Sequence, residues 1–526
     1  MIKKITSHTL ITILSLFAFL APGLITSFAQ ATTTTFSSNT TEDNKKYATT
    51  TSGENTILVT SGIVNLNYPI IEKSGSVDSE EADFKGINAG VLVKEGGTLS
   101  ITGGSLITNG AHANGAFAYG QDSTLNLSDM TIQTSASYSG GIMVTGGATV
   151  TANNCSVSTT GNSSAPIRSD RGGGTMTITG GTYESSGIGS PAIYSTADIS
   201  VEGATLDASA SEGIVVEGAN SVSLTNVQLT DNNDQLNGKS DTYKNIFLYQ
   251  SMSGDAKDGT ATFTAKDSTI HTDNGDTFFI TNTTATINLE NTTFTNRNGD
   301  FLRIRAAAWG NSGKNGGHAT FNLVNQTIEG NSYIDDISSL TINMEDGSLI
   351  SGAINTDNKA GKISLTMSSD SVLSLTADTY LSSLENADVT NSNIYGNGQY
   401  HLYIDGRKVS ISQDVYVPPK SEEETTAASG QDDSNYIIIY VMIAILAIIV
   451  ITGITAFFII KNKDDKKPKG PENLGDVPSG VNTAKEAPRT PPATPGTYPT
   501  TGLPPVPQPP AEPQDQTRTP FPPSAF

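Results

Sequence analysis

The sequence predicts an all-β fold: a right-handed parallel β-helix of about a dozen three-strand coils, followed by one transmembrane helix and a disordered tail. Three observations predict it. An apolar pattern returns about every two dozen residues, a turn-forming residue accompanies nearly every copy, and one uncharged apolar run lies near the C-terminus. A period of this length is typical of solenoids, because one repeat alone cannot bury its apolar face.

The repeated unit is short and has the two-residue period of a β-strand. It places two apolar residues two positions apart, then a bend, then a further apolar residue, as in Leu125, Leu127, Met130 and Ile132. Helical periodicity is absent between the copies, so we expect strands joined by turns. Copies begin at Leu99, Leu125, Val150, Met176, Ile199, Val222, Phe263, Ile287, Phe321, Ile342, Leu365 and Ala387, with a weaker first copy at Ile57.

The bend of each copy carries a residue that tolerates the left-handed αL conformation. Gly, Asn and Asp adopt that conformation more readily than other residues. Because they recur in phase with the apolar pattern, we expect one αL residue per coil, stacked at a shared bend. The bend residues are Gly103, Asp129, Asn154, Gly180, Gly203, Asn226, Asp267, Asn291, Asn325, Asp346, Ser369 and Asn391.

A third strand precedes several copies, at residues 90–93, 141–144, 213–216 and 277–280. Each coil should therefore have three strands and three corners. The one cysteine, Cys155, occupies an inward position and is interpreted as a small buried hydrophobe, since a single thiol forms no internal disulfide. No pattern predicts a cofactor or a metal site.

The N-terminal residues 1–31 are typical of a cleavable signal peptide. Lys3 and Lys4 precede an apolar stretch, and Ala29-Gln30-Ala31 gives the small-x-small pattern of a cleavage site. We expect a Thr/Ser-rich segment at 32–54, the β-helix ectodomain at 55–415 and a linker at 416–435.

Residues 436–460 form an uncharged apolar run long enough to cross a bilayer. Lysines follow it from Lys461 and acidic residues precede it, which predicts a single-pass protein of the cell membrane with its N-terminal domain outside and its C-terminus in the cytoplasm. The tail at 461–526 is proline-rich and is expected to be disordered. Its segment Pro504–Pro510 has PxxP spacing, which suits either an SH3-like partner or a solvated tail.

The charge of the chain excludes one class of partner. The formal net charge is −22, which argues against nucleic acid because nucleic-acid binding needs a basic surface.

Residues 55–415 resemble the pectin-lyase-like superfamily of right-handed parallel β-helices, and especially its adhesin-like members on microbial cell surfaces. The resemblance rests on the coil pattern above and on Gly-Gly-Thr/Ser steps at 96–98, 103–105 and 180–182. It implies a fold more than an activity, since this superfamily contains lyases, hydrolases, tailspikes and adhesins.

An enzyme on this scaffold would need converging carboxylates. Asp276 and Asp300 each follow Asn-Gly and precede a strand, so they are expected to stack. The candidates for catalysis are Asp300, Asp335 and Asp336, with Arg303 as the base of a lyase. The alternative is that these aspartates cap turns at corners.

Sugar binding without chemistry needs an aromatic platform with polar neighbours. Phe117, Tyr194, Phe247 and Phe279 are predicted to share one strand layer, and Trp309 lies in the long insertion 306–317. The predicted ligand-binding residues are Phe117, Tyr194, Phe279 and Trp309. The alternative is that some of these rings face the core, because a one-residue shift reverses the face of a strand.

Two hypotheses of function follow. The first, which we prefer, is a membrane-anchored, adhesin-like surface protein that binds a glycan or a neighbouring surface. The second is a membrane-tethered polysaccharide lyase or glycoside hydrolase.

Overall fold

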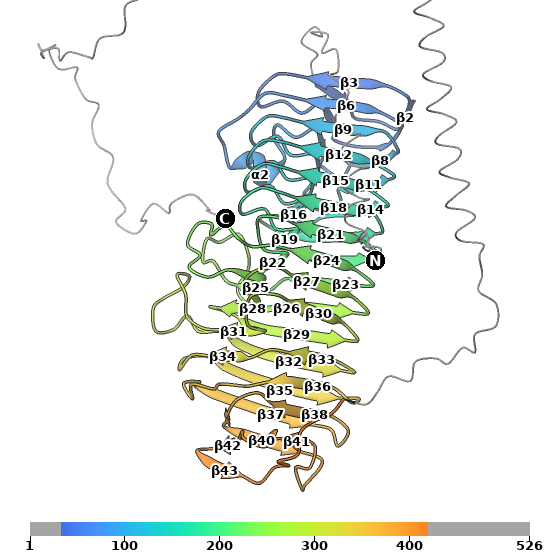
Figure 1. Ribbon diagram of the computed structural model, residues 1–526. Coiled ribbons are helices and arrows are strands. Elements are labelled where there is room, and N and C mark those ends of the chain that lie inside the picture. Colours follow the sequence, from blue (N-terminus) through green and yellow to red (C-terminus); the bar gives the residue numbers. More distant parts are fainter. Residues whose placement is uncertain (1–32, 419–526) are drawn as a thin grey trace, which may run out of the picture. The chain divides into compact units, whose positions relative to one another are not determined.

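The computed structural model describes residues 33–418, which form a parallel β-solenoid of the right-handed type with about 15 turns (Figure 1). This confirms the predicted all-β, coiled architecture. The predictions for residues 1–31, for the span 436–460 and for the tail 461–526 lie outside the described residues. Within 33–418, no helix has the length and apolar composition that a membrane span requires.

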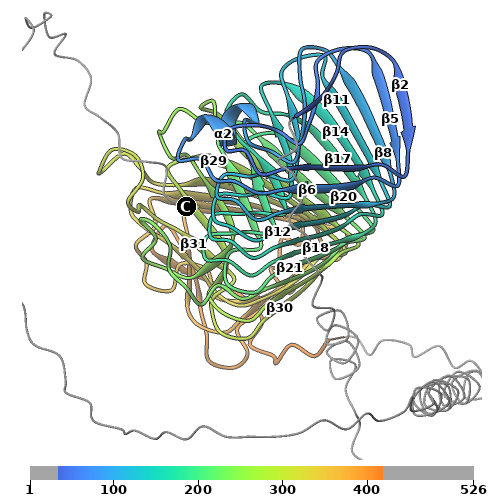
Figure 2. The same ribbon diagram turned by 90° about the horizontal axis from the view of Figure 1, so that it is seen from above.

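Three long parallel sheets form the sides of the solenoid (Figure 2). Sheet A has twelve strands. They are β1 (Thr34–Phe36), β4 (Ile57–Val59), β7 (Val91–Val93), β10 (Ala116–Tyr119), β13 (Ile142–Thr145), β16 (Ile167–Ser169), β19 (Ile193–Ser195), β22 (Ile214–Glu217), β25 (Lys244–Tyr249), β28 (Asp276–Thr281), β31 (Leu302–Ile304) and β34 (Ser332–Ile334).

Sheet B is the longest, with fourteen strands. They are β2 (Thr40–Asp43), β5 (Ile63–Asn67), β8 (Thr98–Thr102), β11 (Thr124–Ser128), β14 (Ala148–Asn153), β17 (Gly174–Thr179), β20 (Asp198–Glu202), β23 (Ser221–Thr225), β26 (Thr260–Lys266), β29 (Thr284–Glu290), β32 (His318–Val324), β35 (Ser339–Glu345), β37 (Lys362–Met367) and β40 (Ser383–Asn386).

Sheet C has ten strands, and two small sheets follow it along the chain. Sheet C contains β3 (Lys46–Thr49), β6 (Ile70–Lys73), β9 (Ser105–Thr108), β12 (Thr131–Thr134), β15 (Ser156–Thr159), β18 (Thr182–Ser185), β21 (Thr205–Ala208), β24 (Gln228–Asp231), β27 (Thr269–Thr272) and β30 (Thr293–Asn296). Sheet D contains β33 (Thr327–Glu329), β36 (Leu349–Gly352), β38 (Val372–Leu375) and β41 (Ile394–Tyr395), and sheet E contains β39 (Thr379–Leu381), β42 (Leu402–Ile404) and β43 (Arg407–Val409). The described residues also contain a short helix, α2 (Glu81–Lys85).

The core consists of ladders in which apolar residues stack from coil to coil. In sheet B, Leu125 pairs with Leu99 on one side and with Val150 on the other, and all three are fully buried. Cys155 is buried in the same core, as predicted. Burial of these side chains is the main stabilising contribution, because their apolar surface is removed from water only where coils stack.

The bend that leaves sheet B toward sheet C or D is the most regular corner. All the predicted bend residues except Ser369 have positive φ, for example Asp129 (53°), Asn154 (50°) and Asn226 (52°). The strand register stacks successive bends, and Asn154 Nδ2 donates a hydrogen bond to Asp129 Oδ1 at 2.7 Å. The shared αL bend is therefore confirmed. At Ser369 the connection from β37 to β38 is longer, and hydrogen bonds from Ser368 shape it instead.

The N-terminal coils begin earlier than the sequence suggested. Strands β1, β2 and β3 form a coil within 32–54, upstream of the expected start at residue 55. This coil gave no apolar signal, because the half-buried positions of β2 are Thr40 and Glu42. The weak copy placed at Ile57 was also misassigned: Ile57 belongs to sheet A, and the unit in sheet B begins at Val64, which pairs with Leu99.

The last predicted copy, at Ala387, is wrong, because its residue Val389 does not face the core. Val389 is 90% exposed, since it lies in the connection between β40 and β41 rather than in a strand. Asp388 orders that connection by accepting hydrogen bonds from Thr390 and Ser392.

Candidate functional site

The four longest connections within residues 33–418 all border sheet A. The bend between sheets B and C holds two residues, whereas insertions precede or follow strands of sheet A. Figure 2 shows α2 and long loops on the side of the solenoid away from β2, β5 and β8. The insertions cover residues 74–90, 232–243, 250–259 and 305–317. Because binding residues are usually found on such loops, we expect a functional site on the outer face of sheet A.

One ladder of outward side chains follows the middle of sheet A. Strand register places Phe117 beside Met143, and then Arg168, Tyr194, Val215, Phe247, Phe279 and Arg303 in succession. The prediction that Phe117, Tyr194, Phe247 and Phe279 share one layer is confirmed.

These rings are covered by the insertions. Phe117 is buried with Leu92 and Met143, while Tyr194, Phe247, Phe279 and Trp309 belong to a second buried cluster. Their exposed fractions are 0% for Phe117, 4% for Tyr194, 1% for Phe247, 1% for Phe279 and 8% for Trp309. The rings thus anchor the loops that cross them. Ligand binding by these residues stays a prediction. Of the four predicted ligand-binding residues, Tyr194 lines a cavity between α2 and the loops over sheet A.

Lys244 shows how the loops are anchored. Its Nζ lies 4.5 Å from the ring centre of Phe247 and 5.8 Å from that of Trp309. The same Nζ is 3.2 Å from Glu212 Oε1 and donates to Ser240 Oγ at 2.7 Å. A buried ammonium of this kind needs both aromatic and anionic partners, which ties the loop at 232–243 to sheet A.

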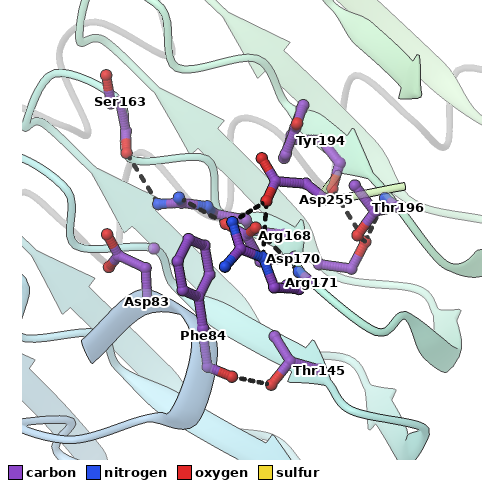
Figure 3. A network of polar contacts seen from close by, with 12 residues as sticks. Asp83, Phe84, Thr145, Ser163, Arg168, Asp170, Arg171, Tyr194, Thr196 and Asp255 are labelled. Carbon is purple, nitrogen blue, oxygen red and sulfur yellow. Dashed lines mark hydrogen bonds and ion pairs between the residues drawn. The ribbon is translucent and has the colours of Figure 1, made fainter. Parts of the chain in front are cut away.

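A cavity of about 500 Å³ lies between α2 and the loops over sheet A, and we call it the outer pocket. Figure 3 shows side chains from α2, β16 and the loop at 250–259 converging at this place. The outer pocket is lined by Asp78, Ser79, Glu80, Asp83, His112, Tyr138, Asn162, Ser163, Arg168, Asp170, Ile188, Tyr194, Asn237, Gly238 and Asp255.

The floor of the outer pocket is a buried ion pair. Arg168 Nη2 lies 2.9 Å from Asp170 Oδ2, and Arg168 Nη1 donates to the Ser163 carbonyl at 3.1 Å. Burial raises the pKa of Asp170 to about 7, although the charge of Arg168 opposes the rise, and the nearby carboxyls of Asp255 and Asp83 add to it. The Asp170 carboxyl therefore titrates near neutral pH.

One wall combines a carboxylate, an imidazole and an exposed ring. Asp83 of α2 accepts from Asn114 Nδ2 at 3.2 Å and lies 2.9 Å from His112 Nδ1. The imidazole of His112 stacks on the ring of Tyr138, with 4.6 Å between ring centres and 9° between planes. Tyr138 is 42% exposed and lines the outer pocket.

Arg171 joins the two insertions that flank the pocket. Its Nε and Nη2 donate to Asp255 Oδ1 at 2.9 and 2.6 Å, and its Cζ lies 4.0 Å from the ring centre of Phe84 (Figure 3). The Phe84 carbonyl in turn accepts from Thr145 Oγ1 at 2.7 Å. These contacts hold α2 and the loop at 250–259 against sheet A.

The predicted carboxylates separate into two places. Asp300 N donates to Asp276 Oδ1 at 3.1 Å, which confirms that these two residues stack. Arg303 bridges them, with Nε at 2.5 Å from Asp276 Oδ2 and Nη2 at 2.8 Å from Asp300 Oδ2. Burial raises the pKa of Asp300, and the charge of Asp276 adds to this effect. All three line an open depression with Asp241 and Arg305.

Asp335 and Asp336 do not join that depression. Asp335 Oδ2 accepts from the backbone N–H of Ala306 at 2.7 Å, and Asp336 is exposed in a turn. Of the four candidates for catalysis, the structure thus brings together Asp300 and Arg303 only. Within residues 33–418, no three His, Cys, Asp or Glu side chains converge as metal ligands.

Apart from Tyr194, the residues of the outer pocket were missed by sequence reasoning. Asp83 and Asp255 stand in insertions, whose paths across the coils no repeat pattern fixes. A signal did exist at Arg168 and Asp170: a charged residue occupied an outward position of the aromatic layer, with an opposite charge two residues later.

Comparison with protein-family models, with curated proteins and with solved structures finds no match to this chain.

Proposed function

We propose that this chain is a membrane-anchored, adhesin-like β-solenoid of the cell surface that binds a glycan in the outer pocket. The apolar run at 436–460, the lysines that follow it and the signal-peptide pattern at 1–31 support the anchored, outward-facing arrangement. The coil pattern with its αL bends supports a relationship to the pectin-lyase-like superfamily.

The outer pocket carries the proposal for glycan binding. The exposed ring of Tyr138 offers an apolar face on which the C–H groups of a pyranose can stack. Carboxylates accept hydrogen bonds from neighbouring hydroxyls, and side-chain amides such as that of Asn237 can both donate and accept. A concave site with one apolar wall and several fixed polar groups is the usual design of a small-ligand site.

The test is binding of the full chain to a glycan panel, repeated with Tyr138→Ala and Tyr68→Ala. Tyr68 is a matched control, because both tyrosines are exposed and have positive φ (59° at Tyr138 and 52° at Tyr68) while Tyr68 lies outside the pocket lining. We expect binding of at least one glycan class, weakened about tenfold or more by Tyr138→Ala and unchanged by Tyr68→Ala. Absence of glycan binding, or equal loss in both variants, would contradict the proposal.

The anchored arrangement has its own test. In intact cells, an external protease should remove epitopes within 33–418 and spare an epitope at the C-terminus. Protection of both epitopes, or loss of both, would contradict the topology. The proline-rich segment Pro504–Pro510 is proposed to meet an SH3-like partner on the inner side.

Glycoside hydrolysis is a second candidate, favoured by one observation. The Asp170 carboxyl has a pKa of about 7 and shares the outer pocket with Asp83 and Asp255, and hydrolysis of a glycosidic bond uses one protonated and one ionised carboxyl. Incubating the full chain with a polysaccharide panel tests it. New reducing ends that vanish in Asp170→Asn would support hydrolysis, and an unchanged panel would leave binding as the function.

A further inference from the structure

The charges around the outer pocket are unevenly paired. Its lining contains five carboxyl groups, those of Asp78, Glu80, Asp83, Asp170 and Asp255. The inner three have partners: Asp170 pairs with Arg168, Asp255 with Arg171, and Asp83 with His112. These pairs hold the floor and the walls in place.

The arginine that lines the outer pocket is already paired. Arg168 divides its guanidinium between Asp170 and the Ser163 carbonyl, and its side chain is only 12% exposed. Arg171 donates with two nitrogens to Asp255 and covers the ring of Phe84. An incoming carboxylate inside the pocket would therefore have to compete with Asp170 for Arg168, and displacement would leave Asp170 buried without its partner. Arg171 lies outside the pocket lining, and its side chain is 49% exposed.

The rim of the outer pocket, by contrast, carries carboxylates that are not paired with a cation in the described part of the chain. Asp78 and Glu80 are exposed, and among residues 33–418 neither has an ion-pair partner within 4 Å. Both precede Asp83 on the insertion that leads into α2, and both belong to the pocket lining. Unpaired carboxylates at the mouth of a cavity attract cations and repel anions, and the low-dielectric wall strengthens the effect.

We infer that the outer pocket selects a glycan bearing free amino groups, such as an unacetylated hexosamine polymer, and rejects polyuronates. This inference rests on the proposed glycan binding and names its substrate class. The pyranose ring stacks on Tyr138, and the ammonium group of the sugar pairs with Asp78 and Glu80. A uronate polymer, whose carboxylates would meet the same rim, is excluded by charge.

The experiment compares three tetrasaccharides binding to the full chain at pH 6: tetraglucosamine, its fully N-acetylated form and tetragalacturonate. Tetralysine serves as a cation without a sugar ring. Each is measured with the wild type, with the double variant Asp78→Asn/Glu80→Gln, and with the control Asp122→Asn/Glu202→Gln. The control removes the same two charges from exposed positions outside the pocket lining.

We expect tetraglucosamine to bind about tenfold tighter than its acetylated form, and tetragalacturonate to bind weakest. The pocket double variant should abolish the tenfold preference and leave binding of the acetylated form within about twofold, whereas the control should keep the preference. Tightest binding of tetragalacturonate, a preference that survives the pocket variant, or tetralysine binding as tight as tetraglucosamine would each overturn the inference. Failure of every saccharide to bind would instead contradict the proposed glycan binding itself.

Discussion

The outer faces of sheets A and B differ although the same coils build both. Sheet B shows ladders of small polar residues that satisfy one another: Asn322 Nδ2 donates to Asn288 Oδ1 at 2.8 Å, and Asn343 Nδ2 donates to Asn322 Oδ1 at 2.8 Å. Sheet A shows aromatic and charged residues, such as Phe247 and Arg168, buried beneath insertions. The two-residue bends leave the outer face of sheet B uncovered, whereas the insertions cover the outer face of sheet A and enclose the outer pocket.

The largest expected effect is a difference in the free energy of unfolding between substitutions on the outer faces of sheets A and B within one coil. Phe247→Ala removes a ring that stacks on Tyr249 and contacts Trp309 on the outer face of sheet A, so the free energy of unfolding should fall by about 3–5 kcal/mol. Thr262→Ala changes the outer face of sheet B in the same coil, where we expect a change below about 1 kcal/mol. Thermal and urea unfolding measure both, and equal losses would erase the contrast.

The inner face of sheet C extends the comparison of the faces. Unlike the buried charged groups on sheet A that pair with residues of the insertions, a buried carboxyl here has no such partner among the described residues. Asp231 is fully buried, and neither of its carboxyl oxygens has a hydrogen-bond partner of good geometry within 33–418, while the equivalent residue of the next coil is Thr272. We expect Asp231→Thr to raise the free energy of unfolding by about 1–3 kcal/mol at pH 7, measured by urea unfolding. A loss of stability would show that the carboxyl is accommodated after all.

The gain from Asp231→Thr should depend on pH. Burial raises the pKa of Asp231 well above its ordinary value, so the folded chain keeps a proton that the unfolded chain loses above about pH 4. The wild type is therefore destabilised as pH rises from there, and the advantage of the variant should be larger at pH 7 than at pH 4. An advantage that is the same at both values would show that ionisation of Asp231 is not involved.

The regular bend that keeps sheet B bare can be tested at Asn226, which has φ of 52°. A β-branched residue is strained in the αL conformation, so Asn226→Val should lower the free energy of unfolding by about 1–2 kcal/mol. Asn226→Gly is the control and should be close to neutral, since glycine adopts this conformation freely. Equal stability of the two variants in urea unfolding would mean that the bend does not need an αL residue.

The smallest effect is local and belongs to the covered face. Arg171→Ala removes the contacts to Asp255 and Phe84, so amide exchange within 78–86 and 250–259 should accelerate about fivefold, equivalent to about 1 kcal/mol of local opening. Arg297→Ala is the control, because its ion pair with Asp273 is exposed and away from the pocket. Unchanged exchange in Arg171→Ala would show that the insertions are held by other contacts.

Most of the fold could be predicted from sequence because its signals are local and repeated. The αL residues at Asp129 and Asn154 stand at fixed distances from the aliphatics beside them, so each copy supports the next. The prediction failed where a coil lacked those signals: Thr40 and Glu42 replaced aliphatics in the first coil, and Tyr68, a bulky residue with φ of 52°, replaced the expected bend residue in the second.

The candidate site could be predicted only in part. Register alone placed Phe247 and Phe279 in one layer, since strands in stacked coils repeat their positions. It could not show that the rings are covered, nor that Arg171 meets Asp255 across 84 positions of sequence. Those contacts depend on the path of each insertion, which follows from packing against neighbouring coils rather than from any repeated pattern.

Amide exchange of the full chain, with and without its tightest-binding glycan, tests most directly whether the covered face is the functional one. We predict that bound glycan slows exchange around the outer pocket, at 78–86, at 137–139 and at 162–170, and leaves the outer face of sheet B unchanged. Protection confined to sheet B, with the pocket unaffected, would contradict glycan binding at the covered face.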